Sequence, residues 1–348
     1  MLVQDIAFVL VSSVMEQTMA STTQRRKLGL TGPEVFPIAL GCMGMSGMYG
    51  ATDEAESLAT IHAALDAGVN LLDTGDFYGM GQNEMLLGRA LRFQREQVVL
   101  SVKFGAQRAP NGAWLGFDAR PAAVKTALAY SLKRLGVDYI DIYRPSRLDH
   151  TVPIEETIGA IAEMVKAGYV RHIGLSEVGA ETIRRAAAVH TIVDLQIEYA
   201  LVSRGPEAKI FPVLAELGIG ATTYGALSRG LLAGSQPAPA GDFRAYLPRF
   251  TGGNLEQNLR LVAKLKEIAA GKGITHVQLA IAWVLAKGSF IVPVIGARTR
   301  AQLAESLGAL EVKLTAEELA ALESAIPAGA VAGTRYDAAQ RRVLDSEK

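Results

Sequence analysis

The chain has 348 residues, of which 49% are hydrophobic and 20% charged, and its 35 basic residues are balanced by 35 acidic ones. This composition is typical of a globular protein with a large core, and the zero net charge excludes the basic footprint of a nucleic-acid partner. The single cysteine, Cys42, excludes an intramolecular disulfide framework and a cysteine-built metal site. Since it also fits a reducing compartment, we expect a cytoplasmic protein.

Residues 1–18 contain an apolar run, residues 6–11, that is too short to span a bilayer. No basic residue precedes this run, as a secretory signal would require. A second methionine, Met19, begins a stretch that reads like an ordinary protein start. We therefore interpret residues 1–18 as an extension outside the fold, expect no membrane partner, and assign residues 19–348 to one domain.

From residue 35 onward, short apolar runs alternate with longer amphipathic stretches. The expected strands are residues 37–40, 70–73, 98–103, 139–143, 170–175, 193–197, 219–223 and 290–293. The expected helices are residues 53–67, 83–91, 121–135, 153–167, 180–189, 207–217 and 255–272, with extra helices near the C-terminus. Several helices are followed by a glycine, such as Gly136 and Gly218, which accepts the left-handed backbone that ends a helix.

Eight strands, each followed by a helical connection, imply parallel pairing through crossovers. The rival architecture is a doubly wound sheet, which normally carries a G-x-G-x-x-G turn after its first strand. Here that turn reads GCMGMSGMYG (residues 41–50) and does not match. The sequence therefore predicts an α/β fold, a single (β/α)8 TIM barrel. Residues 27–37 are expected to form a hairpin that closes its bottom, and residues 235–253 a long loop at its top.

Polar residues stand where the apolar strands end, which is where barrel enzymes place functional groups. Asp73, Tyr78 and Lys103 make the sharpest group. A phenol with its ordinary pKa of about 10 is a poor acid at neutral pH, but a neighbouring ammonium lowers that pKa. A carboxylate beside the lysine would keep it charged. The group would suit a general acid that protonates a carbonyl oxygen as hydride arrives at carbon.

The stretch LDTGDFYGMGQNEMLLGRAL resembles the D-T-x-x-x-Y-G-x-x-x-x-E-x-x-L-G-x-x-L signature of aldo-keto reductases. Similar blocks run from residue 26 to residue 336, among them LSVKFG, LQIEYAL, YGALSRGLLAG and IGARTRAQLAESLGAL. The later blocks look most like the bacterial and plant branch near the potassium-channel β-subunits. The resemblance implies a (β/α)8 barrel that binds NADPH without a Rossmann motif and reduces a carbonyl.

The resemblance also implies roles for individual residues. Tyr78 would be the general acid, Lys103 the group that lowers its pKa, and Asp73 the residue that orients the lysine. Ser176 and Gln196 would hold the nicotinamide carboxamide, and Tyr224 would stack on the nicotinamide ring. The other implied cofactor contacts are Met43, Asp73, Gly225, the pyrophosphate loop of Leu227, Ser228, Arg229 and Gly230, and the adenosine segment of Gly296, Arg298, Gln302 and Glu305.

One position departs from the family pattern. The usual D-L-Y-x-x-H-R-x-D motif reads DIYRPSRLD here, so Ser146 takes the place of a histidine. That histidine would polarise and orient the carbonyl, whereas serine donates one hydrogen bond and carries no charge. Arg147 either compensates for the loss or is structural. No metal is expected, because the sequence has no ligand cluster and a tyrosine mechanism needs none.

Three functions follow from these observations. The leading hypothesis is an NADPH-dependent reductase of aldehydes or activated ketones, with a small carbonyl substrate. The expected preference for NADPH depends on Arg298. Arg298 and Arg300 could instead be exposed charges at the entry of a helix. Ser146 and the resemblance to channel subunits leave open a cofactor-sensing subunit with slow turnover. A lyase that uses Lys103 as a Schiff-base nucleophile is the third. Trp114 and Phe117 could form an aromatic wall of the substrate site or could simply pack.

Overall fold

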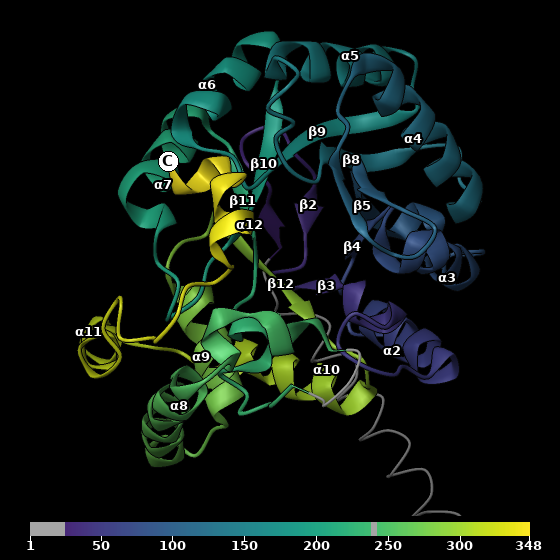
Figure 1. Ribbon diagram of the computed structural model, residues 1–348. Coiled ribbons are helices and arrows are strands. Elements are labelled where there is room, and N and C mark those ends of the chain that lie inside the picture. Colours follow the sequence, from purple (N-terminus) through teal and green to yellow (C-terminus); the bar gives the residue numbers. More distant parts are fainter. Residues whose placement is uncertain (1–24, 238–241) are drawn as a thin grey trace, which may run out of the picture.

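The computed structural model describes residues 25–237 and 242–348. The interpretation of residues 1–18 and four positions of the expected loop at 235–253 lie outside these ranges. Eight parallel strands close into a barrel in the order β3, β4, β5, β8, β9, β10, β11, β12 (Figure 1). The predicted barrel is therefore confirmed. The strands are β3 (Ala39–Gly41), β4 (Leu71–Gly75), β5 (Val99–Phe104), β8 (Ile140–Pro145), β9 (Val170–Ser176), β10 (Ile192–Glu198), β11 (Gly220–Tyr224) and β12 (Ile291–Gly296).

Helices surround the barrel, and their ends follow from local sequence. Asp53 caps the first of them by accepting a hydrogen bond from the Glu56 backbone N–H at 2.9 Å, and Gly136 ends another in the left-handed conformation with φ 65°. The helices are α2 (Glu54–Asp66), α3 (Gln82–Ala90), α4 (Pro121–Leu135), α5 (Ile154–Lys166), α6 (Ala180–Val189), α7 (Pro206–Leu217), α8 (Gly253–Gly271), α9 (His276–Ala286), α10 (Arg300–Leu307), α11 (Ala316–Ala325) and α12 (Ala338–Arg342).

No single helix in the described ranges is long and apolar enough to cross a membrane; α8 and α9 pass such a test only jointly, as a pair bent by 86°. The expected hairpin at residues 27–37 is present as the antiparallel strands β1 (Arg26–Lys27) and β2 (Glu34–Val35). Leu28 and Val35 are fully buried against residues from the barrel strands. The hairpin is fastened by the Leu30 backbone N–H, which donates to the Gly218 carbonyl at 2.8 Å.

A buried ion pair crosses the barrel interior. Arg144 Nη1 lies 3.0 Å from Asp194 Oδ2, and neither side chain is exposed to solvent. Arg144 Nη2 also donates to Ser101 Oγ at 3.0 Å, and Thr222 Oγ1 donates to Asp194 Oδ2 at 2.5 Å. Gly174 leaves room for the pair, because a Cβ there would lie 2.6 Å from Asp194 Oδ1. This charged layer links strands on opposite sides of the barrel.

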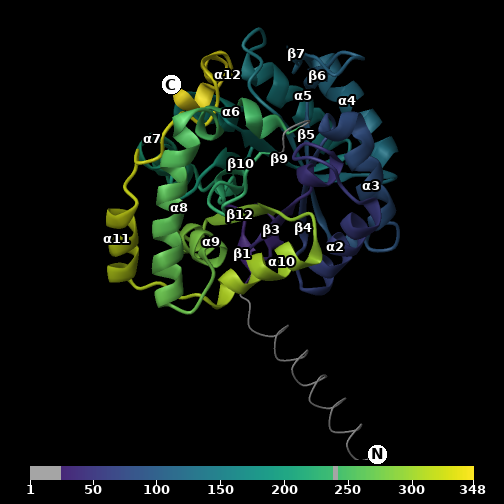
Figure 2. The same ribbon diagram turned by 60° about the horizontal axis from the view of Figure 1, so that its bottom comes forward.

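The sequence analysis missed a second hairpin, β6 (Ala106–Arg108) and β7 (Trp114–Phe117), which follows β5. Its signal was present, since Asn111 and Gly112 form an Asn-Gly pair, which favours tight hairpin turns. Figure 2 shows this hairpin at the same end of the barrel as α12. The part of the expected loop that is described contains the short 3-10 helices η5 (Phe243–Tyr246) and η6 (Pro248–Phe250).

Candidate active site

Parallel pairing of β4 with β5 brings Asp73 and Lys103 together at the carboxyl end of the barrel. Lys103 Nζ forms an ion pair with Asp73 Oδ1, and both residues are buried. The other carboxylate oxygen, Oδ2, accepts hydrogen bonds from Ser101 Oγ at 3.0 Å and from Gln196 Nε2 at 2.8 Å. The carboxylate is therefore held by side chains from two other strands, β5 and β10, and it orients the lysine.

Tyr78 folds back toward this pair from the loop after β4. It begins the 3-10 helix η2 (Tyr78–Gly81), in which Gly79 and Met80 are left-handed with φ 56° and 53°. Its ring lies 5.4 Å from Lys103 Nζ and packs edge-on against Phe77, with ring centroids 4.7 Å apart. The side chain is only 5% exposed. The structure thus brings together the three residues that the sequence analysis grouped.

The pKa of the Tyr78 phenol differs from the lowered value that the sequence analysis expects. Burial raises the pKa of Tyr78 well above its ordinary value, the charge of Asp73 raises it further, and the cation that opposes them is Arg147. The pKa of the phenol is therefore raised rather than lowered, and the separate effect of Lys103 on it stays a prediction. Burial penalises the phenolate, and Asp73 faces the phenol together with the lysine. The phenol keeps its proton, but the raised pKa makes it a weaker acid, so proton transfer would depend on nearby cations such as Arg147.

Ser146 and Arg147 stand at the end of β8. Ser146 is buried, and its Oγ has no hydrogen-bond partner in the described structure. Arg147 Nη1 donates to the Ser146 carbonyl at 2.6 Å and to Ser176 Oγ at 3.4 Å, and Nη2 donates to Tyr336 Oη at 3.1 Å. Arg147 forms no ion pair with a carboxylate of the described residues. Its charge is therefore available to an electron-rich oxygen at the site.

The residues expected around the nicotinamide occupy the ends of the next strands. Ser176 and Gln196 end or nearly end β9 and β10, and both are buried. Tyr224 ends β11, and its hydroxyl donates to Glu177 Oε1 at 2.7 Å. A carboxamide placed between Ser176 and Gln196 would meet side chains that can both donate and accept hydrogen bonds.

The expected pyrophosphate loop follows β11 and has an unusual backbone. Ser228 and Arg229 are left-handed with φ 46° and 57°, and Gly225 and Gly230 have φ 76° and 89°. Leu227 precedes them at the start of the 3-10 helix η4 (Ser228–Gly230). The Arg229 side chain turns inward, and its Nη2 lies 3.0 Å from Glu198 Oε2.

In the adenosine segment, the structure distinguishes Arg298 from Arg300 by their ion pairs, which the sequence analysis could not do. Arg300 is ion-paired with Glu56 at 3.0 Å. Arg298 donates to the Tyr49 carbonyl at 3.0 Å and forms no ion pair with a carboxylate of the described residues. Its backbone N–H donates to Gln302 Oε1 at 2.9 Å, just before α10. Arg298 can therefore receive a phosphate, whereas Arg300 is already neutralised.

The other expected contacts surround the same segment. Gly296 is exposed at the end of β12, and a Cβ there would meet only the Gly41 carbonyl, at 3.9 Å. Met43 begins the 3-10 helix η1 (Met43–Ser46), and Glu305 is half-buried on α10. Open space at the glycine and an unneutralised Arg298 fit a phosphate-bearing cofactor. Within the described residues, no three His, Cys, Asp or Glu side chains are placed to hold a metal ion.

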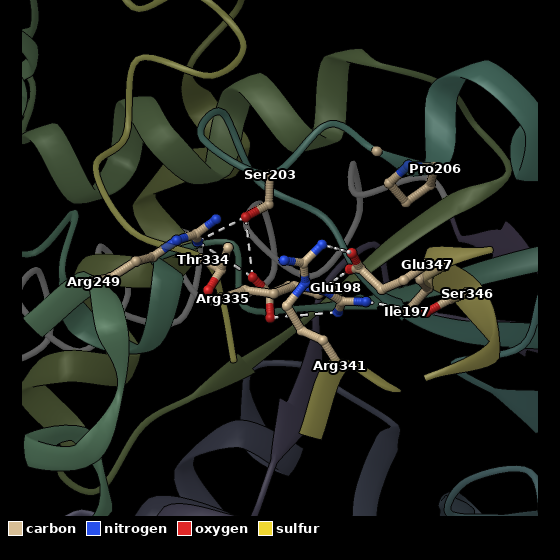
Figure 3. Close-up of a pocket in the computed structure, with 11 residues that line it drawn as sticks. Ile197, Glu198, Ser203, Pro206, Arg249, Thr334, Arg335, Arg341, Ser346 and Glu347 are labelled. Carbon is tan, nitrogen blue, oxygen red and sulfur yellow. Dashed lines mark hydrogen bonds and ion pairs between the residues drawn. The ribbon is translucent and has the colours of Figure 1, made fainter. Parts of the chain in front are cut away.

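The C-terminal segment, residues 334–347, contributes groups that sequence reasoning did not select. Arg335 donates to both oxygens of the fully buried Glu177, at 2.9 and 2.7 Å. Figure 3 shows Arg335 between Glu198 and Glu347. Residue spacing carries no signal for this contact, because Arg335 and Glu177 are 158 positions apart. The surrounding pocket is lined by charged and polar side chains, including Glu198, Ser203, Arg249, Arg335, Arg341 and Glu347.

Aromatic side chains extend from Tyr78 toward the β6–β7 hairpin. Phe77 lies edge-on to Trp114 with ring centroids 6.3 Å apart, and Trp114 packs against Phe117 at 5.1 Å. Arg108 lies over the Trp114 ring at 4.8 Å. Because Trp114 remains 47% exposed, this row packs internally and also presents an aromatic surface beside the site.

Asp76, two residues before Tyr78, provides a pH-dependent test of this region. Burial raises its pKa to about 7, against the hydrogen bond that it accepts from the Gly105 backbone N–H. The folded protein therefore binds a proton that the unfolded chain releases near pH 4. This group's contribution to stability should decrease as pH rises from about 4 to about 7. Urea unfolding at pH 5 and pH 8 should show a smaller difference in Asp76→Asn than in wild type.

The matched control for that experiment is Asp138→Asn, at an exposed position. It should keep the wild-type pH dependence. An Asp76→Asn protein with the same pH dependence as wild type would contradict a proton held on this carboxyl group.

Comparison with known proteins agrees with this geometry. Residues 37–327 match the aldo/keto reductase family. A glycerol dehydrogenase from Gluconobacter oxydans is 29% identical, with a TM-score of 0.79, covering 88% of this chain and 95% of its own. An aldo-keto reductase from Bacillus halodurans, in its holo form, is 30% identical, with a TM-score of 0.74 and coverage of 88% and 97%. A thermostable aldo-keto reductase bound to the inhibitor epalrestat is 28% identical, with a TM-score of 0.69 and coverage of 87% and 99%.

The match spans most of the chain, and the buried Asp73–Lys103 pair beside Tyr78 lies within it. Aldo-keto reductases use nicotinamide cofactors for carbonyl oxidoreduction. The barrel of eight parallel strands agrees with this match. The chain belongs to the aldo/keto reductase family.

Proposed function

We propose that this protein is an NADPH-dependent oxidoreductase that reduces aldehydes or activated ketones to alcohols, with Tyr78 as the proton donor. The observation that carries the proposal is the buried cluster of Tyr78, Lys103 and Asp73 at the barrel mouth. When bound, the nicotinamide supplies the hydride. The residues of the chain bind the cofactor and substrate, exclude water and deliver the proton.

The proton belongs to Tyr78. Burial keeps the phenol protonated, so it can donate to the substrate oxygen as negative charge develops there. Lys103 stays paired with Asp73, which argues against the alternative of a free lysine that forms a Schiff base. Arg147, without a carboxylate partner among the described residues, would stabilise charge on that oxygen.

Ser176, Gln196 and Tyr224 would hold the nicotinamide end of the cofactor. The loop of Leu227, Ser228, Arg229 and Gly230 would lie along the pyrophosphate. Arg298 would bind the phosphate that distinguishes NADPH from NADH, because its charge is not neutralised as that of Arg300 is.

Charge reversal at Arg298 tests the cofactor preference. In Arg298→Glu we expect KM for NADPH to rise by about 10–100-fold, the value of a charge-assisted hydrogen bond, with little change for NADH. Steady-state rates with each cofactor measure this. The control is Arg300→Glu, two residues away on the same helix entry, which should leave the ratio of the two cofactors nearly unchanged. Equal effects of the two substitutions would remove Arg298 from phosphate binding.

The function itself is tested by the oxidation of NADPH in the presence of para-nitrobenzaldehyde, an electron-poor aromatic aldehyde. We expect turnover, and the reverse reaction with NADP+ and an alcohol. Glycerol is one alcohol to include, because the relative from Gluconobacter oxydans is a glycerol dehydrogenase.

A second candidate is a cofactor-binding sensor with slow turnover, and the unpartnered, buried Ser146 Oγ at the histidine position favours it. Tight NADPH binding without turnover of para-nitrobenzaldehyde or other aldehydes would support the sensor and overturn the reductase. Rapid turnover that depends on Tyr78 would exclude the sensor.

A further inference from the structure

The hydroxyl of Tyr336 is part of a chain of hydrogen bonds at the barrel mouth. Arg147 Nη2 donates to Tyr336 Oη at 3.1 Å, Tyr336 Oη lies 3.2 Å from Tyr224 Oη, and Tyr224 Oη donates to Glu177 Oε1 at 2.7 Å. Tyr224 has a single hydroxyl proton, and this proton is already donated in the hydrogen bond to the Glu177 carboxylate. Tyr336 is therefore the donor between the two tyrosines. The two hydroxyl oxygens are farther apart than the usual O–H···O distance of about 2.7–2.8 Å, so the hydrogen bond that Tyr336 donates to Tyr224 is weak.

This hydroxyl is one hydrogen bond away from Arg147, the cation that opposes the raised pKa of Tyr78. Tyr336 and Arg147 are both close enough to Tyr78 for their charges to affect the pKa of its phenol. Arg229 lies over the Tyr336 ring, with its Cζ 4.4 Å from the ring centroid. The ring is thus held by a cation from the expected pyrophosphate loop while the hydroxyl is held by Arg147.

Strong contacts fix the segment that carries Tyr336. The neighbouring Arg335 makes two hydrogen bonds to Glu177, and Ser346 Oγ donates to the same carboxylate at 2.6 Å. Glu177 is a left-handed residue with φ 54°, an uncommon conformation that places its buried carboxylate under the segment. The Gly179 backbone N–H donates to Asp345 Oδ2 at 2.8 Å. Tyr336 is therefore positioned by contacts of Arg335, which precedes it in the sequence, and of Asp345 and Ser346, which follow it.

We propose that Tyr336 is a further substrate-contacting residue, whose hydroxyl donates a hydrogen bond to the carbonyl oxygen and orients it, in place of the histidine that Ser146 has replaced. The proposal rests on the reductase function proposed above. Tyr78 transfers its proton to the oxygen, whereas Tyr336 keeps its own. Burial raises the pKa of Tyr336, but the charges of Arg229 and Arg147 outweigh burial and hold it below its ordinary value. Those cations make the hydroxyl a stronger donor.

The variant Tyr336→Phe removes the hydroxyl and keeps the ring against Arg229. We expect kcat/KM for para-nitrobenzaldehyde to fall by about 10–100-fold, through both a lower kcat and a higher KM. The Kd for NADPH, measured by its fluorescence, should be unchanged. The control is Tyr169→Phe, an exposed tyrosine just before β9, which should behave as wild type.

Two readouts separate this role from a structural one. Wild-type kcat/KM should decline at alkaline pH as Tyr336 ionises, below the ordinary pKa of a phenol, and this decline should move to higher pH in Tyr336→Phe. In a Ser146→His background, which restores the histidine, the loss caused by Tyr336→Phe should be smaller than in wild type. If Ser146→His does not fold, the pH profile decides.

Two results would overturn the proposal: wild-type kinetics in Tyr336→Phe, or a loss fully explained by weaker NADPH binding. An inactive wild type would instead reject the proposed reductase. In that case the complex with NADPH is titrated with para-nitrobenzyl alcohol, the corresponding product. Weaker binding to Tyr336→Phe would support a substrate contact, and equal binding would reject it.

Discussion

Replacement of Tyr78 by phenylalanine should lower kcat for aldehyde reduction by about 10³-fold, within the range that a positioned general acid contributes. The ring and its edge contact with Phe77 remain, so only the proton donor is lost. Cofactor binding should persist, because Tyr78 is not among the residues expected to hold the cofactor. The measurement is steady-state oxidation of NADPH with saturating para-nitrobenzaldehyde, together with the Kd for NADPH.

The matched control is Tyr130→Phe, a tyrosine that is 61% exposed on α4, away from the barrel mouth. It should keep full activity. Equal rates in Tyr78→Phe and wild type would remove Tyr78 from the mechanism. The proton would then have to come from another donor at the barrel mouth.

The second large effect concerns stability. In Asp194→Ala the guanidinium of Arg144 loses its only ion-pair partner among the described residues inside the barrel, where neither side chain is exposed. Removal of one partner of a buried pair leaves an uncompensated charge, which costs about 3–5 kcal/mol. We therefore expect the free energy of unfolding, measured in urea, to fall by about that amount.

The double variant Arg144→Met/Asp194→Ala removes both charges and should recover most of the loss, because apolar side chains can replace a buried pair. The exposed pair Arg184–Glu216 provides the surface control, and Glu216→Ala should have little effect. A single Asp194→Ala variant as stable as wild type would contradict a charged Arg144 in the core.

The fold was predictable because its signals are local. Every expected helix, from residues 53–67 to residues 255–272, has ends within two positions of the observed ones. Each carries an amphipathic pattern and a stop signal that the residues alone determine. The β6–β7 hairpin was missed because its strands are short and, unlike the barrel strands, largely exposed, so no apolar run marks them.

The site was predictable where its residues stand at strand ends. Asp73 and Lys103 were recognisable because neighbouring parallel strands end on the same side of a barrel. Arg298 was recognisable as a candidate phosphate-binding residue. The sequence could not show that Arg300 is neutralised and Arg298 is not, because the partner of Arg300 is Glu56, 244 positions away. The preference for NADPH, the substrate and a cytoplasmic location stay predictions, as does kinship with the potassium-channel branch.

The sequence by itself determined the barrel fold, the position of the candidate catalytic residues Asp73 and Lys103 at the carboxyl ends of its strands, and the replacement of a histidine by Ser146. Periodicity and strand ends are properties of consecutive residues. Only the tertiary structure decided which groups meet there. It brought Tyr336 to Arg147 across 189 positions, and it kept the Tyr78 phenol protonated rather than acidified. The burial of a side chain and the electric field at it depend on atoms from many strands and loops, which come together only when the chain folds.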